Sequence, residues 1–326
     1  MQITRRKLLS LSLGGASLLA WNGWQSHQPI SRRSWALGSE VSMTVVGLSP
    51  SVADRALDAA FRELEVVEQI MSLYRPDSQI SRLNRDRLLH RPHPYLIDVL
   101  EEAEQTARQS DGAFDVTVQS LWQLFAAGQK ESCLPTASEI DAARLQVDWT
   151  KVIVSQDRVT LLEPVTAITL NGIAQGFAAD RAVAALRDHG VEHALINTGE
   201  IAGLGQNSNG RDWTIGIQHP RQPDAFVSVA ALQNRSLATS GDYETTFSAG
   251  FSTNHIFDPR TGRSPSDLAS VSIVAPTAMQ ADALSTAAMV LGPDRTLAMI
   301  ETMPGIDALL ILKQGRAIRT AGFPLS

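Results

Sequence analysis

The stretch TLNGIAQGFAADRA, residues 169–182, decides the fold because it predicts a strand that runs through a glycine-containing turn directly into a helix. Residues 166–170 alternate as in a strand, Asn171-Gly172 is typical of a turn, and the apolar residues that follow recur at helical spacing. Strand-turn-helix connections often hold phosphate groups, since the first N–H groups of a helix lack partners within the helix. The lysine of a phosphate-binding loop is missing here, so a bound phosphate would need another positive charge.

The composition is ordinary for a soluble globular protein. Of 326 residues, 44% are hydrophobic and 19% are charged, which allows one large core or two modest lobes. A net charge of -6 and a pI of about 5.7 predict that neither nucleic acid nor an anionic membrane surface is a partner. Cys133 is the only cysteine, which excludes an intramolecular disulfide and a cysteine metal cluster and favours a structural thiol over a nucleophile.

The N-terminal segment predicts export. The basic residues RRK at 5–7 precede an apolar run over 8–21 that is too short to predict a membrane span, a pattern typical of a twin-arginine signal. A basic start followed by a buried helix is the less favoured alternative. We expect a signal over residues 1–30, cleaved between roughly residues 20 and 33, and one domain over 31–326. The signal implies the twin-arginine export machinery as a partner and a periplasmic location, with membrane tethering if the signal stays attached.

Residue patterns in the rest of the chain predict an α+β fold. Amphipathic spacing predicts helices over residues 53–74 and 95–108. Two segments, residues 72–85 and 128–146, are interpreted as loops, and the second is the best candidate for an internal seam. Because successive predicted strands are joined by turns, we expect a largely antiparallel sheet with helices packed on it. The predicted strands cover residues 35–46, a hairpin over 152–162, and 193–196, 213–218, 226–232, 271–275 and 308–312.

Three polar segments carry side chains suited to binding or catalysis. SLATSGDYE at 236–244 and NHIFDPRTGRSP at 254–265 are interpreted as polar loops, whose density of Ser, Thr, Asp, Asn, His and Arg is typical of binding sites. A lone His255 is by itself more often structural than catalytic. SDGAFDVT either places Asp115 and Thr117 on one side of an extended segment or forms a turn and a helix cap.

A fourth segment, PTAMQADALSTAAMVLG, predicts a helix with a carboxylate and a hydroxyl on one face. Asp282 and Thr286 are four residues apart, so on a helix they project from the same side one turn apart. Such a pair can hold a hard cation such as Mg²⁺ if a backbone carbonyl completes the protein ligands. The alternative is a simple cap, because Asp at the start of a helix usually has that role.

These four segments, taken in order with three others, resemble the signatures of the ApbE family, the Mg²⁺-dependent FAD:protein FMN transferases. The resemblance covers nearly the whole chain after the signal. It implies an ApbE-like α+β fold related to the T-fold. The matching segments are LGS (37–39), SLYRPDSQISRLN, SDGAFDVT, TLNGIAQGFAAD, SLATSGDYE, NHIFDPRTGRSP and ADALSTAAMVLG.

The resemblance implies Mg²⁺ as cofactor and FAD as substrate. The metal would be held by the carbonyl of Ala174, the carboxylate of Asp282 and the hydroxyl of Thr286, and it would supply the positive charge of the missing lysine. Ser285 would lie near the flavin nucleotide. The adenine and ribityl parts of FAD would lie against Leu37, Tyr74, Ala113, Phe114, Asp115, Asn171, Phe177 and Ile256.

The implied reaction joins FMN through a phosphoester to a Thr or Ser hydroxyl of a target flavoprotein and releases AMP. His255 is the first candidate for accepting the proton of that hydroxyl, because imidazole titrates near neutrality, and Asp242 is the second. Two other functions stay open: a non-catalytic FAD-binding maturation or carrier protein, and an FAD pyrophosphatase that yields FMN and AMP.

Three positions depart from the family pattern. Gln175 replaces the usual lysine and Thr169 the usual aspartate, which removes one charge of each sign from the turn. Glu200 replaces a glycine and could narrow the pocket or alter the charge near the metal. GIAQG combined with GEI and a twin-arginine signal resembles the NosX-like branch, associated with nitrous oxide reductase maturation, whose client would be a membrane flavoprotein.

Overall fold

The computed structural model of the protein describes residues 28–131 and 133–326, so residues 1–27 of the predicted export signal lie outside it. An eight-stranded sheet organises this part of the chain, and each of its neighbouring strand pairs is antiparallel, as predicted. Among the described helices, none combines the length and the apolar character needed to cross a membrane. In spatial order the strands are β1 (Ile30–Ala36), β2 (Ser39–Val45), β6 (Ala194–Asn197), β7 (Ile201–Leu204), β10 (Arg235–Gly241), β11 (Leu268–Ala275), β12 (Asp307–Leu312) and β13 (Ala317–Arg319).

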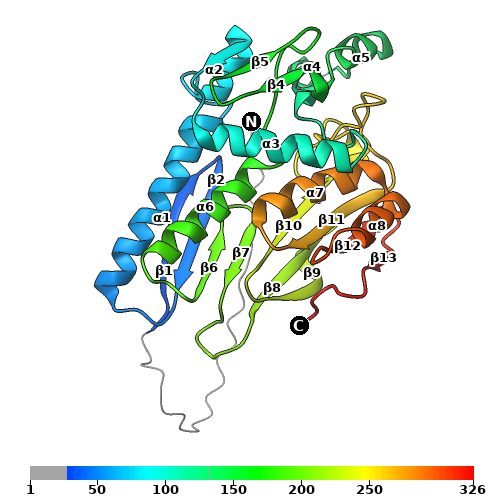
Figure 1. Ribbon diagram of the computed structural model, residues 1–326. Helices are drawn as coiled ribbons and strands as arrows, with labels where there is room; N and C mark the ends of the chain where they lie inside the picture. Colours follow the sequence, from blue (N-terminus) through cyan, green and yellow to red (C-terminus); the bar gives the residue numbers. More distant parts are fainter. Residues whose placement is uncertain (1–27, 132) are drawn as a thin grey trace.

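Both faces of the sheet are covered, by different elements. Helices α1 (Pro50–Met71), α6 (Ala174–Asp188) and α7 (Ala278–Leu291) pack on one face (Figure 1). The hairpin of β8 (Trp213–His219) and β9 (Gln222–Leu232) packs on the opposite face. Strand β12 is therefore buried on both sides, and all of its side chains after the first are apolar. On the α7 side lie Ala308, Leu310 and Leu312, and on the hairpin side lie Leu309 and Ile311.

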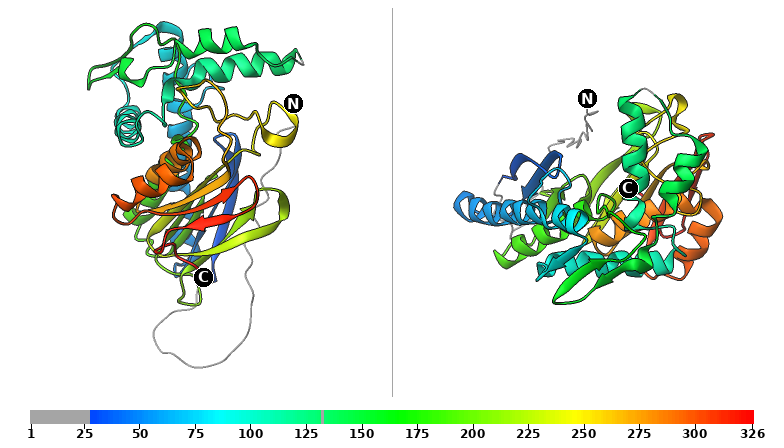
Figure 2. Two further views of the ribbon diagram at one scale, coloured as in Figure 1. Left: turned by 90° about the vertical axis from the view of Figure 1, so that its right-hand side faces the viewer. Right: turned by 90° about the horizontal axis from the view of Figure 1, so that it is seen from above.

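A group of shorter elements lies at one end of the sheet (Figures 1 and 2). A three-stranded sheet there has the order β3-β5-β4, and β4 and β5 form the predicted hairpin. The remaining helix, α8, follows α7 and packs beside β12. The bounds of these elements are α2 (Gln79–Asp86), β3 (Leu88–His90), α3 (Pro94–Gln109), α4 (Gln119–Lys130), α5 (Ala137–Arg144), β4 (Val152–Val154), β5 (Arg158–Leu161) and α8 (Pro293–Glu301).

The predicted first strand, residues 35–46, was wrong as a single element. The chain forms the two strands β1 and β2, joined by a tight turn at Leu37 and Gly38. Both turn residues take positive φ angles, 54° and 78°, which is the geometry of a two-residue antiparallel hairpin.

Predicted loops also proved to contain regular structure. Within residues 72–85 lies α2, whose first turn is capped by the Ser78 hydroxyl accepting from the Ser81 N–H at 3.1 Å. Within residues 128–146 lies α5, which begins with a capping box between Thr136 and Glu139. The polar segment 236–244 begins in β10. Polar side chains cap α2 and α5, and in β10 the Ser240 hydroxyl meets hydroxyls of α7, so polarity alone was a poor signal for a loop.

The strand predicted for residues 166–170 was wrong, and the structure decides between the two alternatives for Asp115. Residues 166–170 are not a strand in the described structure; the side-chain amide of Asn84 takes the place of a neighbouring strand, bonding both the N–H and the carbonyl of Ile168 at 2.8 and 2.9 Å. Asp115 does not begin an extended segment but caps the short 3₁₀ turn Val116–Val118.

Gly176 is where α6 and α7 come closest. A Cβ atom added there would lie 2.2 Å from the carbonyl oxygen of Ala278 and 2.8 Å from Cβ of Asp282. We therefore expect Gly176→Ala to lower the free energy of unfolding by about 2 to 3 kcal/mol, measured by denaturant unfolding. Asp188→Ala, at the exposed end of the same helix, is the control and should change it by less than about 0.5 kcal/mol. Equal stability of the two variants would contradict the close approach.

Candidate active site

The first turn of α6 lies directly against α7. The backbone N–H of Gly176 donates to the Asp282 carboxylate at 3.0 Å, and Asp282 is buried with 5% of its surface exposed. The alternative interpretation of Asp282 as a helix cap is wrong, because Thr277 caps α7 and accepts from the Gln280 N–H. Asp282 instead faces the turn that follows Asn171-Gly172.

Asp180 fixes the same contact one turn further along α6. Its two carboxylate oxygens accept from the backbone N–H groups of Ala278 and Met279, each at 2.8 Å, at the start of α7. Burial raises the pKa of the Asp180 carboxyl to about 6, although these two hydrogen bonds act in the opposite direction. Helix α6 therefore binds the start of α7 through Asp180 and contacts the Asp282 side of α7 through Gly176.

Hydroxyl groups gather beside Asp282. The Ser240 hydroxyl, at the end of β10, lies 2.7 Å from the Ser285 hydroxyl and 3.3 Å from the Thr286 hydroxyl. A Cβ atom on Gly172 would lie 2.9 Å from the Thr286 hydroxyl, so the turn before α6 also reaches this face. The predicted ligands Asp282 and Thr286 and the turn that contains Ala174 are thus brought together.

The oxygen-rich character of this cluster fits a hard divalent cation. The side-chain groups found in it are the carboxylate of Asp282 and the hydroxyls of Ser240, Ser285 and Thr286, and oxygen groups of this kind are the ligands that Mg²⁺ prefers. No group of three His, Cys, Asp or Glu side chains suited to a metal occurs within residues 28–131 and 133–326. A metal here would therefore rely on hydroxyl and backbone oxygens in addition to Asp282.

Five of the residues expected to contact the adenine and ribityl parts of FAD lie in or beside the apolar clusters around α6 and α7. The ring of Phe114 approaches the same turn, 3.5 Å from the position of a Cβ on Gly172. Ala113 and Ile256 belong to the hydrophobic cluster that contains the buried apolar residues of α7. Leu37 packs at the edge of the cluster that contains Ala174 and Phe177, and Phe177 makes an edge contact with Tyr95.

Asp115, Asn171 and Tyr74 are placed differently. The side chain of Asp115 is occupied within the chain, because it accepts from the N–H groups of Thr117 and Trp149, and burial raises the pKa of this carboxyl to about 6. The capping interpretation of this side chain is therefore the one that the structure supports. Asn171 is exposed, and Tyr74 has 75% of its surface exposed.

The two candidate proton acceptors occupy different environments. Asp242 is fully buried and forms two parallel hydrogen bonds with the guanidinium of Arg221 at 2.7 and 2.8 Å, with Lys313 3.5 Å away. Both cations therefore already engage this carboxylate. His255 is half-buried, and its N–H donates to the carbonyl of Thr245 at 3.0 Å.

The residues that depart from the family pattern are bonded within the fold. Thr169 still provides a side-chain acceptor, for the N–H of Asn171 at 3.2 Å. Gln175 reaches the Ser39 hydroxyl at 3.4 Å, and its carbonyl accepts from Thr198 at 3.0 Å. Glu200 is buried and accepts from the backbone N–H of Thr239 at 3.3 Å, so its carboxylate is directed at β10.

The sequence analysis did not single out Ser240 or Asp180, both of which the structure places against the helix that bears Asp282 and Thr286. Ser240 lies in a segment interpreted as a loop, whereas it ends a strand and meets α7. Asp180 ends the quoted TLNGIAQGFAAD signature, and its spacing from Gly176 by one helical turn was the available signal.

Comparisons with known proteins identify the relatives of this chain. The profile of the ApbE family matches residues 37–310. The FAD:protein FMN transferase of Salmonella typhimurium is 28% identical over 297 residues, which cover 87% of this chain and 84% of that protein. The FAD:protein FMN transferase of Treponema pallidum is 31% identical over 320 residues, with coverages of 90% and 87%.

Solved structures show the same similarity. The flavin transferase ApbE from Vibrio cholerae matches with a TM-score of 0.81 and 27% identity, covering 91% of this chain and 98% of that one. The ApbE protein from Thermotoga maritima matches with a TM-score of 0.81 and 29% identity, covering 90% and 97%.

The raised pKa of Asp180 predicts a pH dependence of stability. The folded chain keeps a proton on Asp180 up to about pH 6, whereas the unfolded chain releases it near pH 4, so the stability from this proton is complete below pH 4 and lost as the pH rises to 6. Relative to Asp180→Asn, the wild type should lose up to about 3 kcal/mol of unfolding free energy between pH 4 and pH 7.

Urea unfolding at each pH measures this difference. Asp188→Asn, on the exposed end of α6, is the matched control and should follow the wild type within about 0.5 kcal/mol. If the free energies of unfolding of the wild type and of Asp180→Asn differ by the same amount at every pH, the raised pKa of Asp180 is contradicted.

Proposed function

The chain belongs to the ApbE family and is an FAD:protein FMN transferase, and from this premise we propose that it works with Mg²⁺ held between α6 and α7. The observation that carries the proposal is the contact of the Gly176 N–H with Asp282, beside a cluster of hydroxyls that includes Thr286. Asp282, Thr286 and the carbonyl of Ala174 would hold the metal. When bound there, Mg²⁺ supplies positive charge that offsets the negative charge developing on the leaving AMP.

The chain's own groups account for the remaining parts of the reaction. The hydroxyl oxygen of a target Thr or Ser attacks the phosphorus of the FMN half of FAD, the bond from that phosphorus to the AMP oxygen breaks, and AMP leaves. His255 accepts the hydroxyl proton in this proposal, because Asp242 is already bound by Arg221 and Lys313. Positioning and charge dominate such a phosphoryl transfer, since little covalent work falls to the enzyme.

We propose that the first turn of α6 orients the diphosphate. The helix dipole places partial positive charge at this end, whereas the N–H groups of Ala174 and Gly176 are already bonded, to the Leu170 carbonyl at 2.8 Å and to the Asp282 carboxylate at 3.0 Å. Gly172 and Gly176 keep this turn free of side chains on the side that meets α7. Gln175 leaves the turn without the charge of a lysine, which increases its dependence on the metal.

We expect loss of the Asp282 carboxylate to remove flavin transfer. Purified protein, FAD, Mg²⁺ and an acceptor carrying a flavinylation-type Thr or Ser site should give covalent flavin fluorescence in a denaturing gel, with release of AMP. Asp282→Ala should lower the transfer rate by about 100-fold or more, and Asp282→Asn, which keeps an acceptor for Gly176, should do the same because it removes the charge.

Asp294→Ala, an exposed aspartate at the start of α8, is the control and should transfer flavin at the wild-type rate. Labelling retained in both Asp282 variants would refute the metal site. Release of FMN and AMP from FAD without labelling of the acceptor would identify the protein as a pyrophosphatase instead.

We also propose that the protein acts in the periplasm on a membrane flavoprotein, in the manner of a nitrous oxide reductase maturation factor. The support is the sequence RRK at 5–7 ahead of an apolar run, together with the resemblance to NosX-like proteins. Replacing Arg5 and Arg6 by lysine should retain the protein in the cytoplasm in cell fractionation, whereas Lys7→Gln should be exported normally. Periplasmic accumulation of the double lysine variant would contradict twin-arginine export.

A further inference from the structure

The segment that presents His255 is a narrow ribbon closed by a strained tip. Residues 245–255, here called the His255 ribbon, fold back on themselves through a backbone bond from the Phe247 N–H to the Thr253 carbonyl (2.8 Å) and one from the His255 N–H to the Thr245 carbonyl (3.0 Å). At its tip Phe251 takes a φ of 62°, a left-handed conformation that is costly for a bulky side chain. Such a tip persists only where the surrounding structure holds it.

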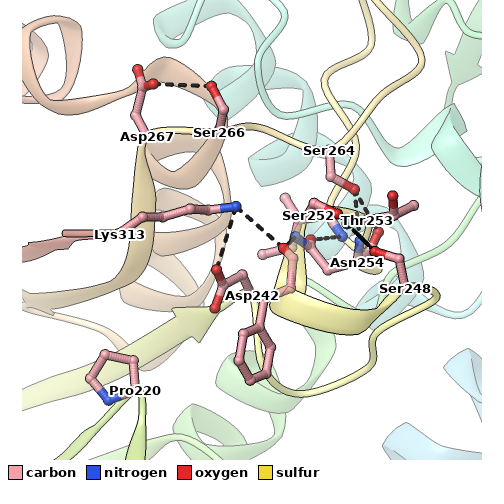
Figure 3. Close-up of polar contacts among 12 residues, drawn as sticks. Pro220, Asp242, Ser248, Ser252, Thr253, Asn254, Ser264, Ser266, Asp267 and Lys313 are labelled. Atoms are coloured by element: carbon pink, nitrogen blue, oxygen red, sulfur yellow. Dashed lines mark hydrogen bonds and ion pairs between the residues drawn. The ribbon is translucent and has the colours of Figure 1, made fainter. Parts of the chain in front are cut away.

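Two cationic side chains contact this tip, and one buried carboxylate binds both of them. The guanidinium of Arg221 lies over the ring of Phe251, 4.2 Å from its centre, and the ammonium of Lys313 donates to the Phe251 carbonyl at 3.3 Å. Both cations also contact the carboxylate of Asp242. Figure 3 shows Lys313 between Asp242 and the part of the ribbon that carries Ser252 and Thr253.

The three members of this group, here called the Asp242 cluster, come from separate parts of the fold. Arg221 lies in the turn between β8 and β9, Asp242 follows β10, and Lys313 follows β12. Asp242 is also tied to the sheet, since its N–H donates to the Ala269 carbonyl at 3.0 Å. The cluster therefore connects the tip of the His255 ribbon to three sheet elements.

The energetics make Arg221 the sensitive member. The carboxylate of Asp242 has no exposed surface, so it depends on its ion pairs, and Arg221 supplies the two shorter bonds. Lys313 is 3.5 Å away and offers one point charge. Removing the guanidinium thus weakens the support of the carboxylate and takes away the contact on the Phe251 ring at the same time.

We propose that the Asp242 cluster positions the His255 ribbon, and through it His255, for flavin transfer, with Arg221 as the positioning residue. Asp242 then serves to align Arg221 and Lys313 rather than to accept a proton. This inference rests on the proposed role of His255 as proton acceptor.

Hydrogen exchange tests the structural part without reference to activity. In Arg221→Ala the amides of residues 245–255 should exchange at least about tenfold faster than in the wild type, and Arg221→Lys should give a smaller increase because an ammonium cannot form two parallel bonds. Phe251→Leu removes the ring under Arg221 but leaves the buried ion pairs intact, and it should also accelerate exchange. This variant provides the test if Arg221→Ala does not fold. Arg316→Ala, an exposed arginine just after β12, is the control. Unchanged exchange in the Arg221 and Phe251 variants would overturn the proposal.

A double-mutant cycle tests the link to His255. Arg221→Ala should lower kcat for flavin transfer about 10- to 100-fold and leave KM for FAD within about twofold, whereas in a His255→Ala background it should change kcat by less than about twofold. Fully multiplicative losses would show that Arg221 does not act through His255, and would overturn the catalytic part. Absence of transfer by the wild type would refute the proposed function itself, while hydrogen exchange would still decide whether the cluster holds the ribbon.

Discussion

The close approach of the first turn of α6 to α7 is the constraint on which the rest of the site depends. Only a glycine at position 176 lets the backbone N–H reach Asp282, since a Cβ would lie 2.2 Å from the Ala278 carbonyl oxygen. Asp180, one turn later, binds the first N–H groups of α7 and fixes the same two helices. Residues 169–182, whose sequence predicts a phosphate-binding turn, therefore also fix the position of the α7 face that carries Asp282 and Thr286.

The sheet supplies the other side of this arrangement. Near the end of strand β10, Ser240 lies against Ser285 and Thr286, and two residues later Asp242 forms ion pairs with Arg221 and Lys313. One strand thus contributes to the proposed metal face and to the cluster that holds the His255 ribbon. The two functions share a rigid element, which keeps the proposed proton acceptor in a fixed relation to the site of bond cleavage.

The sequence predicted the parts of the fold that depend on local periodicity and short motifs. The long helix ending at Met71, the helix bearing Asp282 and the apolar strands β11 and β12 follow from spacing alone. The predictions failed where a side chain far along the chain decides the conformation, as Asn84 does for Ile168. They also failed where polar residues cap a helix or end a strand, because capping residues and loop residues have the same composition.

The site was predictable where the chemistry lies on one element and less so where it is assembled from several. The face of Asp282 and Thr286 needed only the helical repeat, whereas the contact of Ser240 with that face depends on which strand lies under α7. The partners of Asp242 come from two distant turns, so no local pattern could show that its charge is already engaged.

The most direct test of the central claim is the position of a divalent cation in a crystal of the protein with FAD and Mn²⁺, located by anomalous diffraction at the manganese edge. We predict one strong peak bonded to the Asp282 carboxylate and the Thr286 hydroxyl, next to the turn that contains Ala174. A peak bound elsewhere on the chain, or FAD bound with no peak between α6 and α7, would contradict it.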